Sequence, residues 1–270
     1  MRGALRSSTP STENARGGGG SHAADPHPAC QRPTMRCVPL KCEAQLAMQA
    51  LHRVRQRLVR SRTRLINLLR AILLERGIAA PQARRKLEQR LPEILDDADN
   101  GLWPRVRELL AELRAEWQEL DRRILDIDAE LLAEAKGNDA CRWLLEVPGI
   151  GPQTATAIMA ATGNGKAFDC GRDLASWLGL TPRENSSGGQ QRLGSITKRG
   201  NRYLRTLLVH CARSSLDTLA KRPDGLGVWL RRMLASKPER NVVVVALAAR
   251  LARIAWALLS GEKRFQPAPA

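Results

Sequence analysis

Residues Leu144–Gly163 read LLEVPGIGPQTATAIMAATG, and this stretch indicates how the second half of the chain folds. A short apolar helix precedes a tight Pro-Gly-Ile-Gly turn, and a second helix built from small residues follows. Gly149 and Gly151 allow the turn, while small residues such as Ala155 and Ala157 let the two helices approach closely. The pattern predicts a helix-hairpin-helix, whose turn amides and second-helix N-terminus point at one phosphate whatever the base sequence. A hairpin used only for packing is the alternative.

A serine loop follows at Pro182–Arg205, which reads PRENSSGGQQRLGSITKRGNRYLR. Ser186 and Ser187 stand directly before two glycines, and Glu184 is the only acid in the stretch. Arginine side chains, free backbone amides and hydroxyl groups are the groups that bind phosphate. The predicted phosphate contacts here are Arg183, Arg192, Lys198, Arg199, Arg202 and Arg205. A polar loop with a solvated basic face is the alternative.

Helices are expected on both sides of this loop. Phe168–Leu180 precedes it, and Asn201 is a predicted N-cap for a helix over Arg202–Leu219. His210 lies between apolar neighbours in that helix and is interpreted as a core histidine rather than a base. Two further helices, Val228–Ala235 and Asn241–Leu259, are expected to complete a compact helical domain.

Upstream, Cys42–Arg76 is predicted to form one long helix that is rich in arginine. Its apolar residues follow a heptad spacing and consist of Leu51, Val54, Leu58, Leu65, Leu68 and Ile72. The other faces carry arginines with no acid before Glu75. Because like charges repel along such a helix, a polyanion or an acidic partner helix should neutralise it. The predicted nucleic-acid contacts on this helix are Arg53, Arg57, Arg60 and Arg64. A solvated helix face is the alternative.

A second heptad helix is predicted over Arg105–Ala135, after a linker that holds one short helix at Gln82–Leu91. Its apolar residues consist of Val106, Leu110, Leu113, Trp117, Leu120, Ile124, Ile127 and Leu131. Its acidic residues, such as Glu119 and Asp121, could face the arginines of the first helix. We therefore predict a helical hairpin or coiled coil that also makes a homo-oligomer, with a purely intramolecular hairpin as the alternative.

The predicted fold class is all-α, with a long coiled-coil hairpin, a compact helical domain that contains the helix-hairpin-helix, and a disordered N-terminal tail. The domain boundaries follow from breaks in composition. The predicted segments are a tail at 1–31, a remnant of an upstream domain at 32–41, the coiled-coil region at 42–139, the C-terminal domain at 140–262 and a frayed tail at 263–270.

The composition of the chain limits the kinds of molecule that it can bind. A formal charge of +17 and a sequence pI of about 10.8 indicate nucleic acid or an anionic surface. Aromatic residues make up only 3% of the chain, which argues against a single-strand-binding stacking platform. The most apolar run, Val242–Leu259, is interrupted by Arg250 and Arg253, so we expect no membrane partner. The six cysteines form no close pair, which favours free thiols in a reducing cytoplasm, associated with the nucleoid.

From Val147 onward, the sequence VPGIGPQTATAIMAATGN and the sequence DLASWLGLTPRENSSGGQQRLGSITKRGNRYLRTLLVHCAR resemble the C-terminal domain of bacterial transposases of the insertion sequence 110/116/902 family. RPTMRCVPLK and the arginine helix resemble the middle region of that family, so the resemblance covers most of the chain after about residue 31. It implies an RNA-guided recombinase that binds DNA and a structured guide RNA. It also implies that the serine before the glycine pair, Ser187, is the nucleophile, with Ser186 as the alternative.

The resemblance also implies an N-terminal RuvC-like domain with four acidic magnesium ligands in intact relatives. The residues before the matching region are few and rich in glycine and serine, so they cannot hold that domain, and Asp25 is the only acid where its last pair of ligands is expected. We therefore expect no metal ligand and no cofactor in this chain, and a truncated or frameshifted copy that binds DNA but is catalytically incomplete. The alternative is a non-catalytic helical protein that binds nucleic acid or joins assemblies of an intact relative.

Overall fold

The structure is a computed structural model that describes residues 40–237, 239–261 and 264–267. These residues form nine helices and one two-stranded antiparallel sheet, which confirms a mostly helical fold. The described residues from Lys41 onward make one compact unit. The predicted tail at 1–31 and nearly all of the predicted remnant at 32–41 lie outside the described residues, and the predicted domain boundaries stay predictions.

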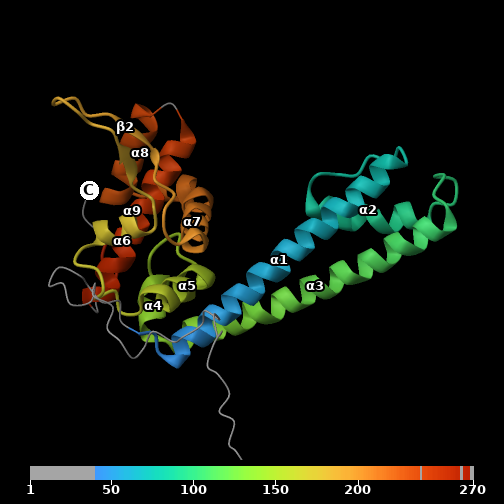
Figure 1. Cartoon of the computed structure of the whole chain (residues 1–270), viewed down its shortest axis with the longest axis horizontal. Coiled ribbons are helices and arrows are strands. Elements are labelled where there is room, and N and C mark those ends of the chain that lie inside the picture. Colours follow the sequence, from blue (N-terminus) through green and yellow to red (C-terminus); the bar gives the residue numbers. More distant parts are fainter. Residues whose placement is uncertain (1–39, 238, 262–263, 268–270) are drawn as a thin grey trace, which may run out of the picture. The chain divides into compact units, whose positions relative to one another are not determined.

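Helices α1 (Glu43–Glu75) and α3 (Pro104–Gly137) lie side by side and run antiparallel (Figure 1). Two ion pairs set their register: Arg55 binds Asp128 and Arg62 binds Asp121, with N···O distances of 2.5 and 2.6 Å. The predicted apolar face of α3 is confirmed, since five of its eight members are buried and the other three pack partly buried against the same cluster. The five buried residues are Leu110, Trp117, Leu120, Ile124 and Leu131. The hairpin therefore packs on itself within one chain, and its pairing with a second copy stays a prediction.

Only part of the predicted pairing of acids with arginines is present. Asp121 faces α1, but Glu119 instead binds Arg122 of its own helix at 2.7 Å. Helix α3 therefore neutralises part of its own charge through pairs spaced three or four residues apart, and it leaves most of the arginines of α1 without a carboxylate.

The buried face of α1 differs from the predicted heptad face. Val54 and Leu68 are 43% and 49% exposed, whereas Ile66, Leu69 and Leu73 are buried. A straight α-helix has 3.6 residues per turn, so its contact face drifts away from a strict heptad spacing. Here α1 contacts α5 near its start and α3 along its length, and this change of neighbours determines which residues are buried.

Helix α2 (Arg84–Asp96) packs against the far end of the α1–α3 hairpin (Figure 1). Its residues Leu87, Leu91 and Ile94 are buried there and join the hydrophobic cluster of α1 and α3. The sequence predicted that this helix ends at Leu91, but it continues through Pro92.

The C-terminal helices surround a second hydrophobic cluster. They are α4 (Asp139–Leu145), α5 (Pro152–Thr162), α6 (Gly171–Trp177), α7 (Arg202–Ala220), α8 (Gly225–Ser236) and α9 (Arg240–Gly261). Leu208 of α7 and Leu251 of α9 are fully buried at its centre. Asn201 caps α7 as predicted, because its Oδ1 accepts a hydrogen bond from the N–H of Leu204. In the stretch predicted as a frayed tail, Phe265 packs against this cluster.

Helix α9 is long and apolar enough, by length and composition, to cross a membrane, although its arginines had argued against such a span. Half of its most apolar window is buried inside the protein, where α6 and α7 pack against it. Arg250 lies over the ring of Trp229, 4.5 Å from its centroid. The apolar composition of α9 is therefore explained by its burial as a core helix of the protein.

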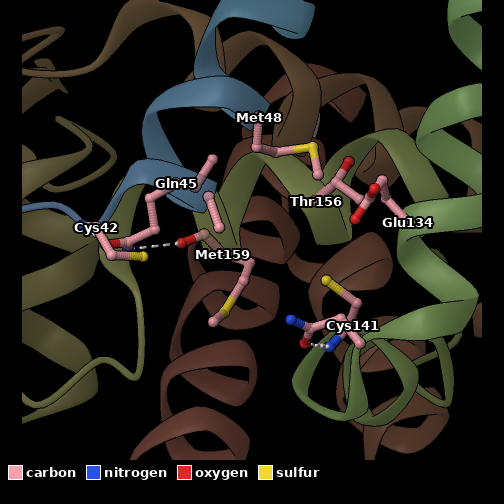
Figure 2. Close-up of a pocket in the computed structure, with 10 residues that line it drawn as sticks. Cys42, Gln45, Met48, Glu134, Cys141, Thr156 and Met159 are labelled. Carbon is pink, nitrogen blue, oxygen red and sulfur yellow. Dashed lines mark hydrogen bonds between the residues drawn. The ribbon is translucent and has the colours of Figure 1, made fainter.

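The start of α1 rests on α5. Gln45 Nε2 donates to the carbonyl oxygen of Met159 at 3.3 Å, beside a cavity of about 150 Å³ (Figure 2). Met48 and Cys141 also line this cavity. Burial raises the pKa of the Cys141 thiol to about 11, so this cysteine is an inert packing residue. Cys42, Cys141, Cys170 and Cys211, the four described cysteines, are free thiols as predicted.

Candidate nucleic-acid interface

The predicted serine loop is a β-hairpin. Strands β1 (Pro182–Glu184) and β2 (Leu193–Ile196) pair antiparallel, and Ser187 forms a bridge with Gln190 at the far end. Between them, Gly188 and Gly189 have φ values of +58° and +77°. A tight two-residue turn with positive φ at both central positions requires residues such as glycine. The glycine pair therefore closes a short β-hairpin, where the sequence had predicted a flexible loop.

The two serines have different surroundings. Ser186 Oγ donates to Glu184 Oε1 at 2.8 Å and accepts from the backbone N–H of Arg192 at 3.2 Å. The hydroxyl of Ser187 has no hydrogen-bond partner among residues 40–237, and the residue is exposed at the hairpin turn. Ser186 therefore stabilises the hairpin, while the Ser187 hydroxyl is free to contact another molecule.

The cations predicted around the serines are mostly exposed. Within the described part of the chain, none of the following forms an ion pair: Arg183, Arg192, Lys198, Arg199 and Arg202. Arg205 differs, because its Nη1 donates to the carbonyl oxygens of Leu178 and Arg199, both at 2.8 Å. Arg205 thus joins the segment before α7 to the end of α6, a structural role that the sequence did not indicate.

The segment before α7 is held in a constrained conformation. Lys198 has a φ of +56° and donates its backbone N–H to the carbonyl oxygen of Gly179 at 3.2 Å. Gly200 has a φ of +76°, and its Cα lies directly against the carbonyl oxygen of Trp177. Left-handed backbone at a non-glycine residue persists only where its surroundings enforce it. Contacts with the end of α6 therefore hold the backbone of Lys198–Gly200 at a defined place on the surface.

Six of the seven arginines of α1 divide into two sets, and the seventh, Arg70, donates to the carbonyl oxygens of Pro81 and Gln82. Arg55 and Arg62 are half-buried and paired with the carboxylates of α3. The other set consists of Arg53, Arg57, Arg60 and Arg64, all exposed and none of them in an ion pair within the described residues. Spacings of four, three and four residues put this second set on one side of the helix. The four arginines that the sequence predicted as nucleic-acid contacts form one basic face, called the arginine face below.

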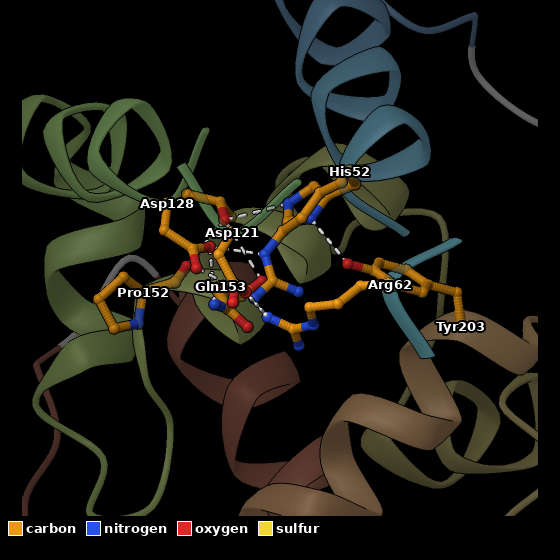
Figure 3. A network of polar contacts seen from close by, with 9 residues as sticks. His52, Arg62, Asp121, Asp128, Pro152, Gln153 and Tyr203 are labelled. Atoms are coloured by element: carbon orange, nitrogen blue, oxygen red, sulfur yellow. Dashed lines mark hydrogen bonds and ion pairs between the residues drawn. The ribbon is translucent and has the colours of Figure 1, made fainter. Parts of the chain in front are cut away.

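A polar network joins α1 to the C-terminal helices (Figure 3). His52 Nδ1 lies 3.0 Å from the hydroxyl of Tyr203, and His52 Nε2 lies 3.1 Å from Thr156 Oγ1. Asp128 accepts from Arg55 and, at 2.8 Å, from Nε2 of Gln153. Sequence reasoning missed this network. Its one signal was Tyr203, the single tyrosine of the chain.

Burial, together with the nearby charge of Arg55, lowers the pKa of His52 to about 4, although Asp128 acts in the opposite direction. Burial also raises the pKa of the Tyr203 hydroxyl, so both groups are neutral at pH 7. Two neutral side chains can share hydrogen bonds inside the protein without a buried charge. The network therefore fixes the position of α1, and with it the arginine face, relative to α5 and α7.

Acidification should weaken the fold through His52. An unfolded histidine has a pKa near 6.5, so the stabilisation from the neutral buried ring is complete above that pH and is lost as pH falls toward 4. We expect the free energy of unfolding to fall by about 2 kcal/mol more in the natural protein than in His52→Gln between pH 7 and pH 4.5. Urea titrations of both proteins at the two pH values measure this difference. An equal loss in both would show that His52 carries no part of the acid sensitivity.

The two glycines of the predicted turn between α4 and α5 differ in how closely other residues pack against them. Gly149 has a φ of +96°, and a Cβ there would lie 2.6 Å from Ser215 Oγ of α7, so close packing accounts for this glycine. Gly151 is the N-cap of α5 and has open space beside it.

His210 is exposed, so its interpretation as a core histidine was wrong. It lies on the outer side of α7, away from the buried leucine stripe.

Acidic and metal-binding groups complete the description of the surface. Among the described residues, no group of three or more His, Cys, Asp or Glu side chains lies close enough together to hold a metal ion.

Comparison with known proteins identifies the family of this chain. Residues 141–223, which include the serine hairpin and α7, match the model of the transposase IS116/IS110/IS902 family. The chain is 45% identical over 240 residues to a probable family 20 transposase of Pseudomonas aeruginosa, covering 88% of this chain and 71% of the relative. It is 39% identical over 228 residues to the transposase for insertion sequence element IS1328 of Yersinia enterocolitica, covering 84% of this chain and 67% of the relative.

A third relative is the transposase for insertion sequence element IS1111A of Coxiella burnetii, 38% identical over 238 residues, with 88% of this chain and 65% of the relative covered. This chain belongs to the IS116/IS110/IS902 transposase family. It spans about two thirds of the length of these relatives.

Proposed function

We propose that this chain binds DNA, together with a structured RNA from its element, through two groups of exposed cations. One group is the arginine face of α1, and the other surrounds the serine hairpin and the segment before α7. Membership of a transposase family supports DNA as a partner. The exposed arginines have no carboxylate partner among the described residues, so phosphate is the group that would neutralise them. The turn amides and the N-terminus of α5 would add sequence-independent contacts if the predicted helix-hairpin-helix operates.

We further propose Ser187 as the nucleophile of strand exchange. Its hydroxyl is exposed at the tight turn of the hairpin and has no intramolecular partner there, with Arg183 and Arg192 on the adjoining strand segments; this observation carries the assignment. The oxygen of Ser187 would attack phosphorus, a phosphorus–oxygen bond of the DNA strand would break, and the serine proton would leave with the released hydroxyl group. The arginines would stabilise the charge that develops on the phosphate oxygens.

Ser186 remains the alternative nucleophile. Its hydroxyl already donates to the carboxylate of Glu184, an arrangement in which Glu184 could accept the proton as a base. Against this, the same hydroxyl accepts the N–H of Arg192, so its displacement would disturb the hairpin.

A strand-exchange assay tests the assignment. The chain, Ser187→Ala and Ser186→Ala are incubated with supercoiled plasmid that carries the element ends, with magnesium and the RNA of the element. A covalent protein–DNA product from the natural chain and from Ser186→Ala, with none from Ser187→Ala, would assign the nucleophile to Ser187. DNA affinity of Ser187→Ala should change by less than about threefold, because one hydroxyl contributes little to a contact made mainly of charges.

The other outcomes decide between the alternatives. A product that depends on Ser186 rather than Ser187 would move the nucleophile by one residue. Salt-sensitive DNA binding with no product from any of the three chains would favour the non-catalytic nucleic-acid-binding protein, which acts without chemistry of its own.

A further inference from the structure

A cavity of about 220 Å³ lies between α1, α5 and the start of α7. Gln49, Arg53 and Gln56 of α1 line one side, and Asn201 and Tyr203 line the other. The surface between them consists of three small side chains of α5: Ala157, Ala160 and Ala161. The cavity thus combines small apolar side chains with several polar groups, and polar groups placed beside apolar ones fix the orientation of a ligand in many binding sites.

Several polar atoms of this cavity are free to bind a ligand. Gln49 donates through Nε2 to the carbonyl oxygen of Ala160, which leaves its amide oxygen as an acceptor. Asn201 uses Oδ1 to cap α7, which leaves its NH₂ group as a donor. The carboxamide of Gln56 forms no hydrogen bond within the described residues and can both donate and accept. His52, in contrast, has both ring nitrogens engaged and forms a fixed wall.

The cavity lies where the two groups of cations meet. Arg53 belongs to the arginine face and also lines the cavity, while Asn201 directly follows the exposed Lys198–Arg199 pair and Gly200. These residues come from distant parts of the sequence, and the packing of α7 and α5 on α1 brings them together. A nucleic-acid strand whose phosphates follow the arginine face would pass the entrance of this cavity.

We propose that the cavity binds one unpaired nucleobase of the strand held by the arginine face. The proposal rests on the function proposed above. A nucleobase is planar, so its face can lie on the alanines, and its edge carries donors and acceptors that the three carboxamides can match. A phosphate would suit the cavity less well, because it carries only acceptors and gains nothing from the apolar surface. The guanidinium of Arg53 could stack on the exposed side of the ring.

Oligonucleotide binding tests the proposal. The probes are a 15-nucleotide thymidine strand, a 15-nucleotide uridine strand and a deoxyribose-phosphate strand of the same length without bases. We expect the natural chain to bind at least one base-bearing strand about tenfold more tightly than the abasic strand, within the range known for one base contact. The thymidine and uridine arms show whether the base comes from DNA or RNA.

Two substitutions locate the effect. Ala161→Leu fills the cavity from α5, and Gln56→Leu removes its free carboxamide on α1. Each should bring the ratio between base-bearing and abasic strands close to one, with the salt slope unchanged because the phosphate contacts remain. Ala129→Leu, on the exposed side of α3, is the matched control and should keep the tenfold ratio.

The failures can be told apart. Salt-dependent binding with equal affinity for base-bearing and abasic strands would overturn the nucleobase site and leave the proposed function standing. A tenfold ratio that survives both cavity substitutions would place the base elsewhere and also overturn the site. No salt-dependent binding of any strand would overturn the proposed function and this inference together. Circular dichroism identifies a variant that has not folded, and Gln56→Leu carries the test if Ala161→Leu does not fold.

Discussion

Changing Arg53, Arg57, Arg60 and Arg64 together to glutamine should reduce DNA affinity about 10³-fold at 0.1 M salt. Each arginine that neutralises a phosphate releases about one counterion, so four contacts contribute about 3 to 4 to the slope of log affinity against log salt. The natural chain should therefore show a steep slope, and the variant should lose about 3 to 4 of it while keeping the part contributed by the cations around the serine hairpin. Glutamine keeps the helix propensity of arginine, so α1 and its buried face should remain intact. Fluorescence anisotropy with a labelled duplex between 0.05 and about 0.3 M salt measures the affinity and the slope.

A matched control separates the effect of the arginine face on DNA affinity from the effect of net charge. Arg85, Arg90, Arg123 and Arg232 are also exposed and form no ion pair within the described residues. Their change to glutamine removes the same formal charge from other surfaces and should lower the affinity less than about tenfold, through long-range attraction alone. Equal losses in the two variants would mean that overall charge, rather than the arginine face, attracts DNA. Intact affinity in both variants would remove α1 from the interface.

Gly200→Ala should destabilise the C-terminal helices by at least about 4 kcal/mol, or prevent them from folding. The residue has a φ of +76°, and a Cβ there would overlap the carbonyl oxygen of Trp177. Because that oxygen belongs to the end of α6, relief requires the segment before α7 to move away from it. The movement would also break the contacts of Arg205 with Leu178 and Arg199. Thermal unfolding followed by circular dichroism measures the loss.

Gly77→Ala is the control for backbone strain alone. Gly77 has the same φ of +76°, but nothing lies within 4 Å of the position that its Cβ would occupy. Left-handed backbone at alanine should cost about 1 to 2 kcal/mol there. A loss of stability in Gly200→Ala no larger than that in Gly77→Ala would show that the close approach of Gly200 to Trp177 does not stabilise the fold. The contact with α6 would then not explain the conformation of the Lys198–Arg199 segment.

Local features of this protein were readable from its sequence. The heptad spacing of α3, the cap at Asn201 and the unbalanced arginines at positions 53, 57, 60 and 64 depend on residues within a few turns of one another. Helix periodicity alone places such residues on a common face. The long resemblance across the serine hairpin likewise identified the family from the order of residues alone.

Features that depend on neighbouring elements were not readable. Val54 and Leu68 are exposed because α3 and α5 cover a different side of α1 than a heptad spacing indicates. His210 is exposed because α7 turns its leucines, rather than that histidine, toward α9. The hairpin escaped prediction because its strands are only three and four residues long, too short for a clear alternation.

The sequence by itself determined the helical class, the family, the two groups of cations and the serine pair, because composition, spacing and motif are properties of the chain order. Only the tertiary structure decided how these parts combine. It left the Ser187 hydroxyl free while binding that of Ser186, and it placed Arg205 on backbone carbonyl oxygens. It also brought Arg53 and Asn201 to one cavity. These outcomes depend on contacts between residues far apart in the sequence, which packing selects and local periodicity does not encode.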